Sequence, residues 1–184
     1  MKYYDKNALK LSHEYIKANV NPTDITVDAT MGRGRDTLLL CQLSKKVFAF
    51  DIQEEALAST RLLLEENGCN NASLILDSHH NLKSYVQSAK CVVFNFGFLP
   101  GGDHKIYSHG ETSIKAVKAA LDIIDIDGFV SICSYYGGDT GFEERDSLLA
   151  FLETLDAKKY TVMLHSFHNR PNCPPLFIVI EKNH

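Results

Sequence analysis

The 184-residue sequence lacks several features that would assign it to a specialised class of protein. No apolar run approaches the roughly 20 residues that a helix needs to cross a bilayer, and the charged N-terminus has no apolar core of a signal peptide. The five cysteines are never as close as Cys-x-x-Cys, which excludes a zinc ribbon and a thioredoxin-type site. Their odd number also argues against a disulfide framework, so we expect a protein of the reducing cytoplasm. Because no apolar run is long enough to cross a bilayer, we also expect no membrane partner.

An excess of positive charge is also missing. The chain has 19 Lys and Arg residues against 23 Asp and Glu residues, which gives a formal net charge of −4. This balance excludes a general nucleic-acid coat protein, because non-specific binding of phosphates needs a basic surface. Binding of RNA would require a local patch. The candidates lie between Asp156 and His184 and are Lys158, Lys159, Arg170 and Lys182, with His165, His168 and His184 beside them. The alternative is that these residues form an ordinary solvated rim.

Three familiar patterns of chemistry are absent as well. There is no Gly-Lys-Ser/Thr sequence, which excludes a P-loop, and no Gly-x-Ser-x-Gly sequence, so hydrolysis by a Ser/His/Asp triad is unsupported. The histidine pairs His79–His80 and His165–His168 have no obvious third ligand at metal-binding spacing. We therefore expect no metal site.

The composition is typical of one globular domain covering residues 1–184, with 45% hydrophobic and 23% charged residues and no internal repeat or linker. Seven short runs rich in aliphatic and aromatic residues are predicted to be strands: residues 25–29, 47–51, 73–77, 91–95, 129–133, 160–164 and 176–180. The first four runs are almost continuous in apolar residues. This pattern is typical of strands buried on both faces of a parallel sheet.

Helices are predicted where apolar residues recur at helical spacing: residues 8–19, 36–43, 54–67, 112–124 and 143–155. Only residues 166–175 join the last two strands, too few for a crossover helix, so these strands should pair antiparallel. The sequence therefore predicts an α/β fold with a seven-stranded, mostly parallel sheet, an antiparallel C-terminal hairpin and helices on both faces.

A glycine-containing turn follows the first expected strand and opens a helix. Gly32 and Gly34 allow a tight turn and leave room for a ligand against the backbone, although Gly-x-Gly alone is a weak signal. Polar residues end the next three strands, namely Asp51, Asp77 and Asn95. Ligands bind open α/β sheets at the carboxyl ends of strands, and a carboxylate after the second strand can accept ribose hydroxyls. The alternative is that these residues are helix caps and turn formers.

Residues 28–37, Asp-Ala-Thr-Met-Gly-Arg-Gly-Arg-Asp-Thr, resemble the first motif of class I S-adenosylmethionine-dependent methyltransferases. More narrowly, they are similar to a small bacterial family labelled "putative rRNA methylase", whose members are understood as tRNA wobble-uridine methyltransferases. The similarity continues through residues 51–53, 77–79, 95–103 and 174–182. It implies a Rossmann-like fold, S-adenosylmethionine as cofactor and tRNA as partner, with N-methylation of 5-aminomethyl-(2-thio)uridine as the reaction.

The resemblance also implies which residues hold the methionine end of the cofactor. Asp28 and the backbone of Thr30, Gly32 and Gly34 would face it, because the positive amino group needs an anionic or carbonyl partner. Asp36 opens the next helix, and a favourable interaction with the helix dipole explains it equally well.

The ribose and the adenine are assigned to the strand ends that follow. Asp51 would accept the ribose hydroxyls, and Gln53 would flank the adenine. The adenine edge would be bordered by Asp77, Ser78 and His79. All five residues follow the second or third expected strand, at the edge of the sheet where ligands bind.

Catalysis is assigned to the end of the fourth strand. Asn95-Phe96-Gly97-Phe98 is similar to the Asn-Pro-Pro-Tyr/Phe motif of amino-methylating nucleic-acid enzymes. Asn95 would border the cofactor, and its Oδ1 and the Phe96 carbonyl could accept the N–H groups of an amine whose lone pair points at the methyl group. Phe98 would offer a flat face on which a flipped-out base stacks. The alternative is an ordinary strand-to-loop transition with Phe98 in the core.

Loops over the same edge carry candidate substrate-binding residues. Asp103 and His104 are the titratable groups nearest to the expected amine and are candidate general bases. The alternative is that the amine loses its proton before it binds. Tyr135 could stack on a base or hydrogen-bond to it, and Arg170 could contact phosphate. Two positions depart from the family pattern, since His104 replaces the usual lysine and Gly138 the usual histidine. The contribution of both positions to substrate handling is therefore open.

Other functions are compatible with the same residues. The acidic net charge fits a class I methyltransferase of a small metabolite, and the family label also allows rRNA as substrate. A non-catalytic cofactor-binding domain is a third alternative, against which Asp51, Asn95 and the two turn glycines argue. Because we find no appended RNA-binding module, the catalytic domain would recognise RNA by itself or as a homodimer.

Overall fold

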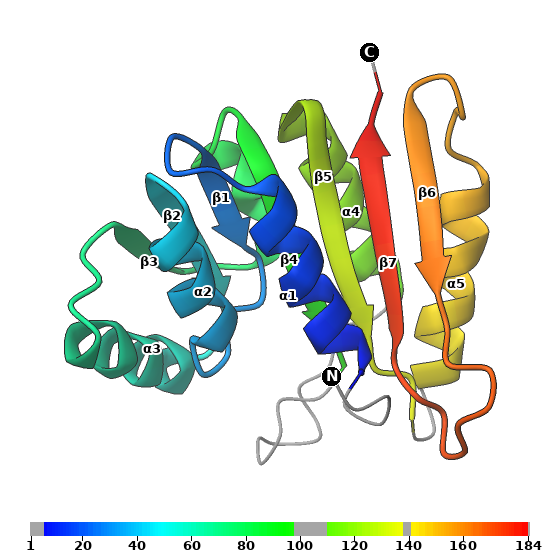
Figure 1. Cartoon of the computed structure of the whole chain (residues 1–184), viewed down its shortest axis with the longest axis horizontal. Helices are drawn as coiled ribbons and strands as arrows, with labels where there is room; N and C mark the ends of the chain where they lie inside the picture. Colours follow the sequence, from blue (N-terminus) through cyan, green and yellow to red (C-terminus); the bar gives the residue numbers. More distant parts are fainter. Residues whose placement is uncertain (1–5, 98–109, 138–140, 184) are drawn as a thin grey trace.

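The computed structural model describes residues 6–97, 110–137 and 141–183 and contains a seven-stranded sheet with the order β3-β2-β1-β4-β5-β7-β6. Strands β1 to β5 are parallel, whereas β7 runs antiparallel to both its neighbours, so β6 points the same way as β5 (Figure 1). The strands are β1 (Ile25–Asp28), β2 (Lys46–Asp51), β3 (Ala72–Leu76), β4 (Ala89–Phe96), β5 (Ile124–Ser134), β6 (Tyr160–His165) and β7 (Leu176–Lys182). The predicted α/β fold with an antiparallel C-terminal hairpin is confirmed.

Helices cover both faces of the sheet, as predicted. They are α1 (Ala8–Asn19), α2 (Arg35–Leu43), α3 (Glu54–Glu66), the 3-10 helix η2 (His79–Ser84), α4 (Gly110–Ile123) and α5 (Gly141–Glu153). Figure 1 shows α1, α2 and α3 in front of the sheet and α4 and α5 behind it. Of the helices that the structure describes, none combines the length and the apolar character needed to cross a membrane.

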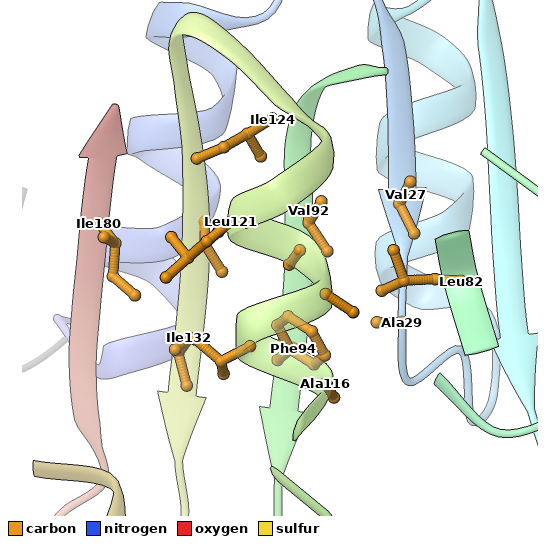
Figure 2. Close-up of a cluster of buried hydrophobic side chains, with 14 of the residues drawn as sticks. Val27, Ala29, Leu82, Val92, Phe94, Ala116, Leu121, Ile124, Ile132 and Ile180 are labelled. Carbon is orange, nitrogen blue, oxygen red and sulfur yellow. The ribbon is translucent and has the colours of Figure 1, made fainter. Parts of the chain in front are cut away.

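The core explains why the central strands are apolar throughout. Val92 and Phe94 of β4 and Ile132 of β5 are completely buried on the face that α4 covers (Figure 2). On the opposite face, Val93 and Phe129 are buried in the cluster that includes residues of α1 and α2. Alternate residues of a strand point to opposite faces, so burial of both faces requires apolar residues at successive positions. Each fully buried side chain of this size contributes roughly 1.5–3 kcal/mol.

Three local features differ from the sequence interpretation. The predicted burial of the third strand on both faces is wrong, because β3 is the edge strand and Leu76 is 48% exposed. β5 is longer than predicted, since it starts at Ile124 directly after α4 and passes through Asp127 at φ 61°. Residues 79–84 form the 3-10 helix η2, which has no apolar periodicity that would predict it.

The parallel strands bring their carboxyl ends to one edge of the sheet, at the bottom of Figure 1. The start of α1 and the connection between β6 and β7 lie at the same edge. A hydrogen bond joins these two segments, because the guanidinium group of Arg170 donates to the Lys6 carbonyl. The glycine turn, the polar strand ends and the N-terminal end of α1 therefore all lie at this edge of the sheet.

Candidate active site

The turn after β1 is built around the carboxylate of Asp28. Asp28 is completely buried, and its oxygens accept the Thr30 backbone N–H at 3.2 Å and the Thr37 hydroxyl at 2.6 Å. These bonds join the end of β1 to the first turn of α2. The structure thus positions Asp28 beneath the turn that it helps to shape, and its contact with a methionine group stays a prediction.

Gly32 and Gly34 adopt left-handed backbone conformations, with φ of 49° and 79°. A Cβ on Gly34 would lie 2.8 Å from Oγ1 and 3.0 Å from Cα of Thr60 on α3. The Thr60 hydroxyl also donates to the Gly32 carbonyl at 3.3 Å. The turn is therefore pressed against α3, and both the backbone conformation and the available space require glycine at position 34.

Asp51 joins this turn to the end of β2. One carboxylate oxygen accepts the Gly32 N–H and the other accepts the Gln53 N–H, each at 3.0 Å. Burial raises the pKa of Asp51, and the hydrogen bonds from the backbone partly offset this effect. Ile52 follows with 59% of its surface exposed. It forms an apolar surface beside Asp51 that the sequence interpretation does not single out.

Asp77, which follows β3, is held by residues of the η2 segment. Its carboxylate accepts the Ser78 N–H at 2.7 Å, the Asn81 side-chain amide at 2.9 Å and the Tyr85 hydroxyl at 2.9 Å. The hydrogen bonds from Asn81 and Tyr85 hold the pKa of Asp77 below its usual value. The Ser78 hydroxyl lies 2.7 Å from Nδ1 of His80. Asp77 and Ser78 therefore organise the start of η2 next to the end of β3.

His79 links η2 to the glycine turn. Its Nδ1 lies 3.2 Å from the Ala29 carbonyl oxygen, and its ring packs edge-on against Phe94 and Phe96. Burial lowers the pKa of His79, which favours the neutral ring. Because a carbonyl oxygen can only accept, Nδ1 must carry the proton in this contact. His79 therefore donates a hydrogen bond at the end of β1 without adding a charge there.

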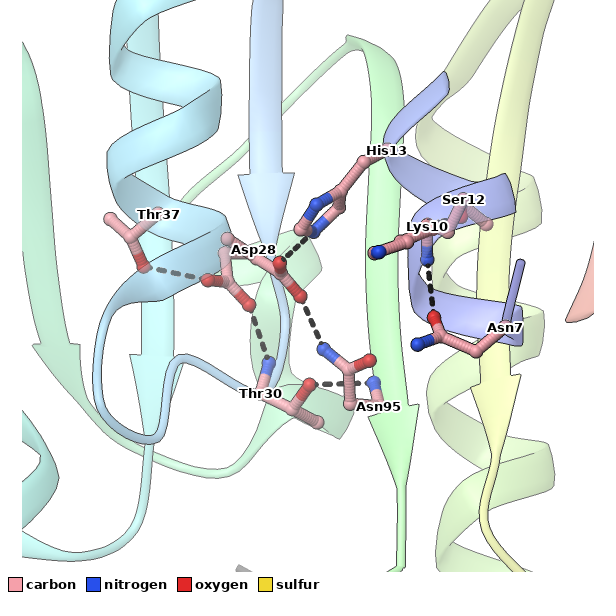
Figure 3. Close-up of polar contacts among 10 residues, drawn as sticks. Asn7, Lys10, Ser12, His13, Asp28, Thr30, Thr37 and Asn95 are labelled. Carbon is pink, nitrogen blue, oxygen red and sulfur yellow. Dashed lines mark hydrogen bonds and ion pairs between the residues drawn. The ribbon is translucent and has the colours of Figure 1, made fainter. Parts of the chain in front are cut away.

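Asn95 lies near the end of β4, next to the glycine turn. Its backbone N–H donates to Thr30 Oγ1 at 2.8 Å, and its Nδ2 donates to Asp36 Oδ2 at 2.5 Å (Figure 3). The other oxygen of Asp36 lies 2.5 Å from His13 Nε2. Only an NH₂ group can donate to a carboxylate, so this contact fixes the orientation of the amide. The Oδ1 of Asn95 is then buried, and it has no hydrogen-bond partner in the described part of the chain.

Three acidic side chains, Asp28, Asp36 and Asp51, lie near one another at this edge of the sheet. The pKa of Asp28 is raised to about 7, first by burial and then by the charge of Asp36, with a smaller contribution from Asp51. A cation bound here would stabilise the ionised form of all three carboxylates. The arrangement is therefore suited to a positively charged ligand. Over residues 6–97, 110–137 and 141–183, no group of three His, Cys, Asp or Glu side chains is arranged to hold a metal ion.

Tyr135 lies beside the end of β4. Its N–H donates to the Phe96 carbonyl at 2.9 Å, and its side chain is 39% exposed. Gly97 has φ 128°, and a Cβ there would lie 2.7 Å from Tyr135 Cβ. Burial raises the pKa of Tyr135 to about 12, and nearby negative charge adds to the effect. Four other residues singled out from the sequence lie outside the described residues: Phe98, Asp103, His104 and Gly138.

The basic residues predicted to form one RNA patch are separated by the length of β6. Arg170 lies in the β6–β7 connection, at the same edge of the sheet as the glycine turn. Its guanidinium group stacks 4.0 Å from the Phe167 ring centroid. Lys158 and Lys159 precede β6 and so lie at the opposite edge of the sheet (Figure 1). A strand of six residues spans about 20 Å. The prediction of a single patch is wrong, because β6 runs between its members.

The Asn95 network contains two residues that the sequence does not assign to the site. For Asp36, the sequence does not distinguish a role in the site from a favourable interaction with the dipole of its helix. For His13, on the helix before the first strand, nothing in the sequence indicates a role in the site. The two residues are 23 positions apart, and no spacing rule connects them. Only the packing of α1 next to α2 and β4 brings His13 to this carboxylate.

Comparison with known proteins gives consistent results. Residues 47–181 match the family described as "Putative rRNA methylase". The crystal structure of a putative rRNA-methylase from Clostridium thermocellum has a TM-score of 0.94 and 43% identity, covering 96% of this chain and 98% of that chain. SMU.1697c of Streptococcus mutans, a putative methyltransferase solved in complex with SAH, has a TM-score of 0.90, 39% identity and the same coverage. The chloroplastic tRNA (mnm(5)s(2)U34)-methyltransferase of Arabidopsis thaliana is 29% identical over 194 residues, covering 96% of this chain and 70% of that protein.

Proposed function

Because the chain belongs to the family described as "Putative rRNA methylase", we propose that it is an S-adenosylmethionine-dependent methyltransferase acting on RNA. We further propose that its substrate is the amine of 5-aminomethyl-(2-thio)uridine at the wobble position of tRNA. The Arabidopsis relative, named for this position of tRNA, supports the choice of substrate. The SAH bound to the Streptococcus mutans relative supports the choice of cofactor, since SAH is what S-adenosylmethionine becomes after methyl transfer.

The residues at the carboxyl edge of the sheet fit this cofactor. S-adenosylmethionine carries a positive sulfonium and a positive amino group, and the carboxylates of Asp28, Asp36 and Asp51 favour a cation. The carboxylate of Asp51 accepts backbone N–H groups on both oxygens and keeps a lone pair that a ribose hydroxyl can use. Ile52, exposed beside Asp51, offers an apolar surface to the adenine. When bound, the cofactor would supply an electrophilic methyl group.

One observation carries the proposed chemistry: the Oδ1 of Asn95 is buried and has no hydrogen-bond partner among the residues that the structure describes. Leaving a buried acceptor unsatisfied costs about 1–3 kcal/mol, which an N–H donor from a substrate would recover. An amine nitrogen whose N–H points at Oδ1 has a fixed direction for its lone pair, as attack on a methyl group requires. The Phe96 carbonyl, which already accepts the Tyr135 N–H, has a second lone pair for the other N–H.

The RNA side of the site is assigned to residues around the same edge. Tyr135, half-exposed beside Gly97, would stack on the base or hydrogen-bond to it, and Arg170 would contact phosphate. Phe98 would stack on the flipped-out uracil. An aliphatic amine has a pKa near that of lysine, about 10.4, so it must lose a proton before attack. Asp103 and His104 are the candidate acceptors of that proton, and loss of the proton before binding would serve equally well.

Nucleoside analysis tests the proposed function. Bulk tRNA from a bacterium that lacks the gene would be incubated with the protein and S-adenosylmethionine, digested and examined by mass spectrometry. We expect one methyl group to appear on the 5-aminomethyl nitrogen of the wobble nucleoside. The free nucleoside 5-aminomethyluridine and purified rRNA serve as parallel substrates. Methylation of either of these without methylation of tRNA would overturn the assignment of the substrate.

A further inference from the structure

Helix α1 contributes a histidine to the Asn95 network. His13 Nε2 contacts one oxygen of Asp36 at 2.5 Å, and Asn95 Nδ2 contacts the other oxygen at 2.5 Å. The Asp36 side chain is 8% exposed, whereas the His13 side chain is 27% exposed. The contact with a carboxylate requires the proton of the ring to be on Nε2. Three residues from α1, α2 and β4 thus form one hydrogen-bonded chain (Figure 3).

Polar and aromatic contacts hold α1 in one position on the sheet. The Ser12 hydroxyl lies 2.8 Å from the Ser131 hydroxyl of β5, in the buried interior. The Tyr15 hydroxyl donates to Glu181 of β7, and the Tyr15 ring packs edge-on against Phe129 at 5.1 Å between centroids. The Tyr15 contacts and the fully buried Ile16 hold α1 on the sheet even without the hydroxyl bond of Ser12, so the His13 ring has a defined position next to Asp36.

We propose that His13 is a positioning residue for methyl transfer, an inference that rests on the proposed function. Its Nε2–H fixes one oxygen of Asp36, so that the other oxygen holds the Asn95 amide with Oδ1 turned away from the carboxylate and free for the substrate amine. Without His13, the Asp36 carboxylate can rotate, and the amide of Asn95 loses its fixed orientation.

The charge of Asp36 adds an electrostatic effect to this orientation. A carboxylate that accepts from Nδ2 polarises the amide and makes Oδ1 a stronger acceptor. Positive charge develops on the amine nitrogen as the methyl group transfers, so its N–H groups become stronger donors in the transition state. An acceptor already oriented before the reaction stabilises that charge without reorganisation. The effect of His13 should therefore appear in kcat more than in the binding of either ligand.

Kinetics of three variants test this inference. His13→Ala removes the donor, His13→Gln keeps an N–H donor, and Ser12→Ala is a matched control that breaks a buried hydrogen bond of the adjacent residue. We expect His13→Ala to lower kcat for tRNA by about tenfold while the Kd of SAH and the KM of tRNA change by less than about twofold. His13→Gln should recover part of the loss. Ser12→Ala should lower Tm but keep the wild-type kcat.

Nuclear magnetic resonance of the protein without ligands provides a readout that does not depend on activity. The side-chain NH₂ resonances of Asn95 are identified by their loss in Asn95→Asp. His13→Ala should shift them, whereas Ser12→Ala should leave them in place. Unshifted resonances, or an equal loss of kcat in His13→Ala and Ser12→Ala, would overturn the role of His13. A wild-type protein that methylates no tRNA, with the resonances shifted as expected, would instead refute the proposed function.

Discussion

A methyl group added to Gly34 tests how tightly the glycine turn is held against α3. Gly34→Ala places a Cβ at φ 79°, where a left-handed conformation costs a residue with a side chain about 1–2 kcal/mol. The new Cβ would also lie 2.8, 2.9 and 3.0 Å from Oγ1, Cγ2 and Cα of Thr60. Since Cα belongs to the backbone, α3 or the turn must move, and such overpacking costs about 1–3 kcal/mol. The free energy of unfolding should therefore fall by about 2–5 kcal/mol.

Gly68→Ala is the matched control for this experiment. Gly68 has a similar φ of 67°, but a Cβ there meets no described atom within 4 Å. Gly68→Ala should therefore lower the free energy of unfolding by only about 1–2 kcal/mol, the cost of the left-handed conformation. Urea denaturation of both variants measures the difference, and calorimetry with SAH should show at least about tenfold weaker binding for Gly34→Ala alone, because a displaced turn no longer fits the cofactor. Equal destabilisation of the two variants, or unchanged SAH binding by Gly34→Ala, would refute this reasoning.

Three further perturbations have defined outcomes. The pKa of Asp28 is raised to about 7 in the folded state, which therefore keeps a proton that the unfolded chain releases near pH 4, so the contribution of Asp28 to stability is lost as pH rises from about 4 to about 7. Urea denaturation at several pH values would measure the free energy of unfolding of both proteins. With Asp28→Asn this free energy should depend less on pH over that range than in the wild type, and the same dependence in both proteins would contradict the reasoning. Asp51→Ala should weaken SAH binding at least about tenfold in calorimetry, since it removes a charged acceptor. Arg170→Ala should lower the affinity for tRNA and the slope of its salt dependence by about 1, whereas Lys158→Ala at the opposite edge should change neither.

The sequence contains most of the information needed for the fold. Continuous apolar runs predict strands buried on both faces, and the short connection of residues 166–175 predicts the antiparallel pairing of the last two strands. The exposure of Leu76 could not be predicted, because burial of a strand depends on its place in the sheet. The strand order, with β3 at one edge and β6 at the other, is a property of the tertiary structure.

The candidate site was predictable only where residues follow strand ends. Asp51 and Asn95 both hydrogen-bond to the glycine turn, through Gly32 and Thr30, as the rule for parallel strands anticipates. His13 reaches the site from a helix that precedes the sheet, so its role depends on packing that no local pattern encodes.

The opposite error concerns the basic patch. Lys158 and Arg170 are close in sequence, but they lie at opposite ends of β6, the strand between them. Proximity along the chain therefore predicts proximity in space only when no extended strand intervenes.

The rate of methyl transfer by Asn95→Ala tests the proposed chemistry most directly. With cofactor saturating, methyl transfer to the 5-aminomethyl nitrogen of tRNA would be followed in a single turnover, and the Kd of SAH would be measured by calorimetry. The loss of the Oδ1 acceptor should slow transfer about a hundredfold, equivalent to about 2.7 kcal/mol, while SAH binding stays close to that of the wild type. Transfer at the wild-type rate would contradict the account, because Asn95 would then have only a structural role at the end of β4.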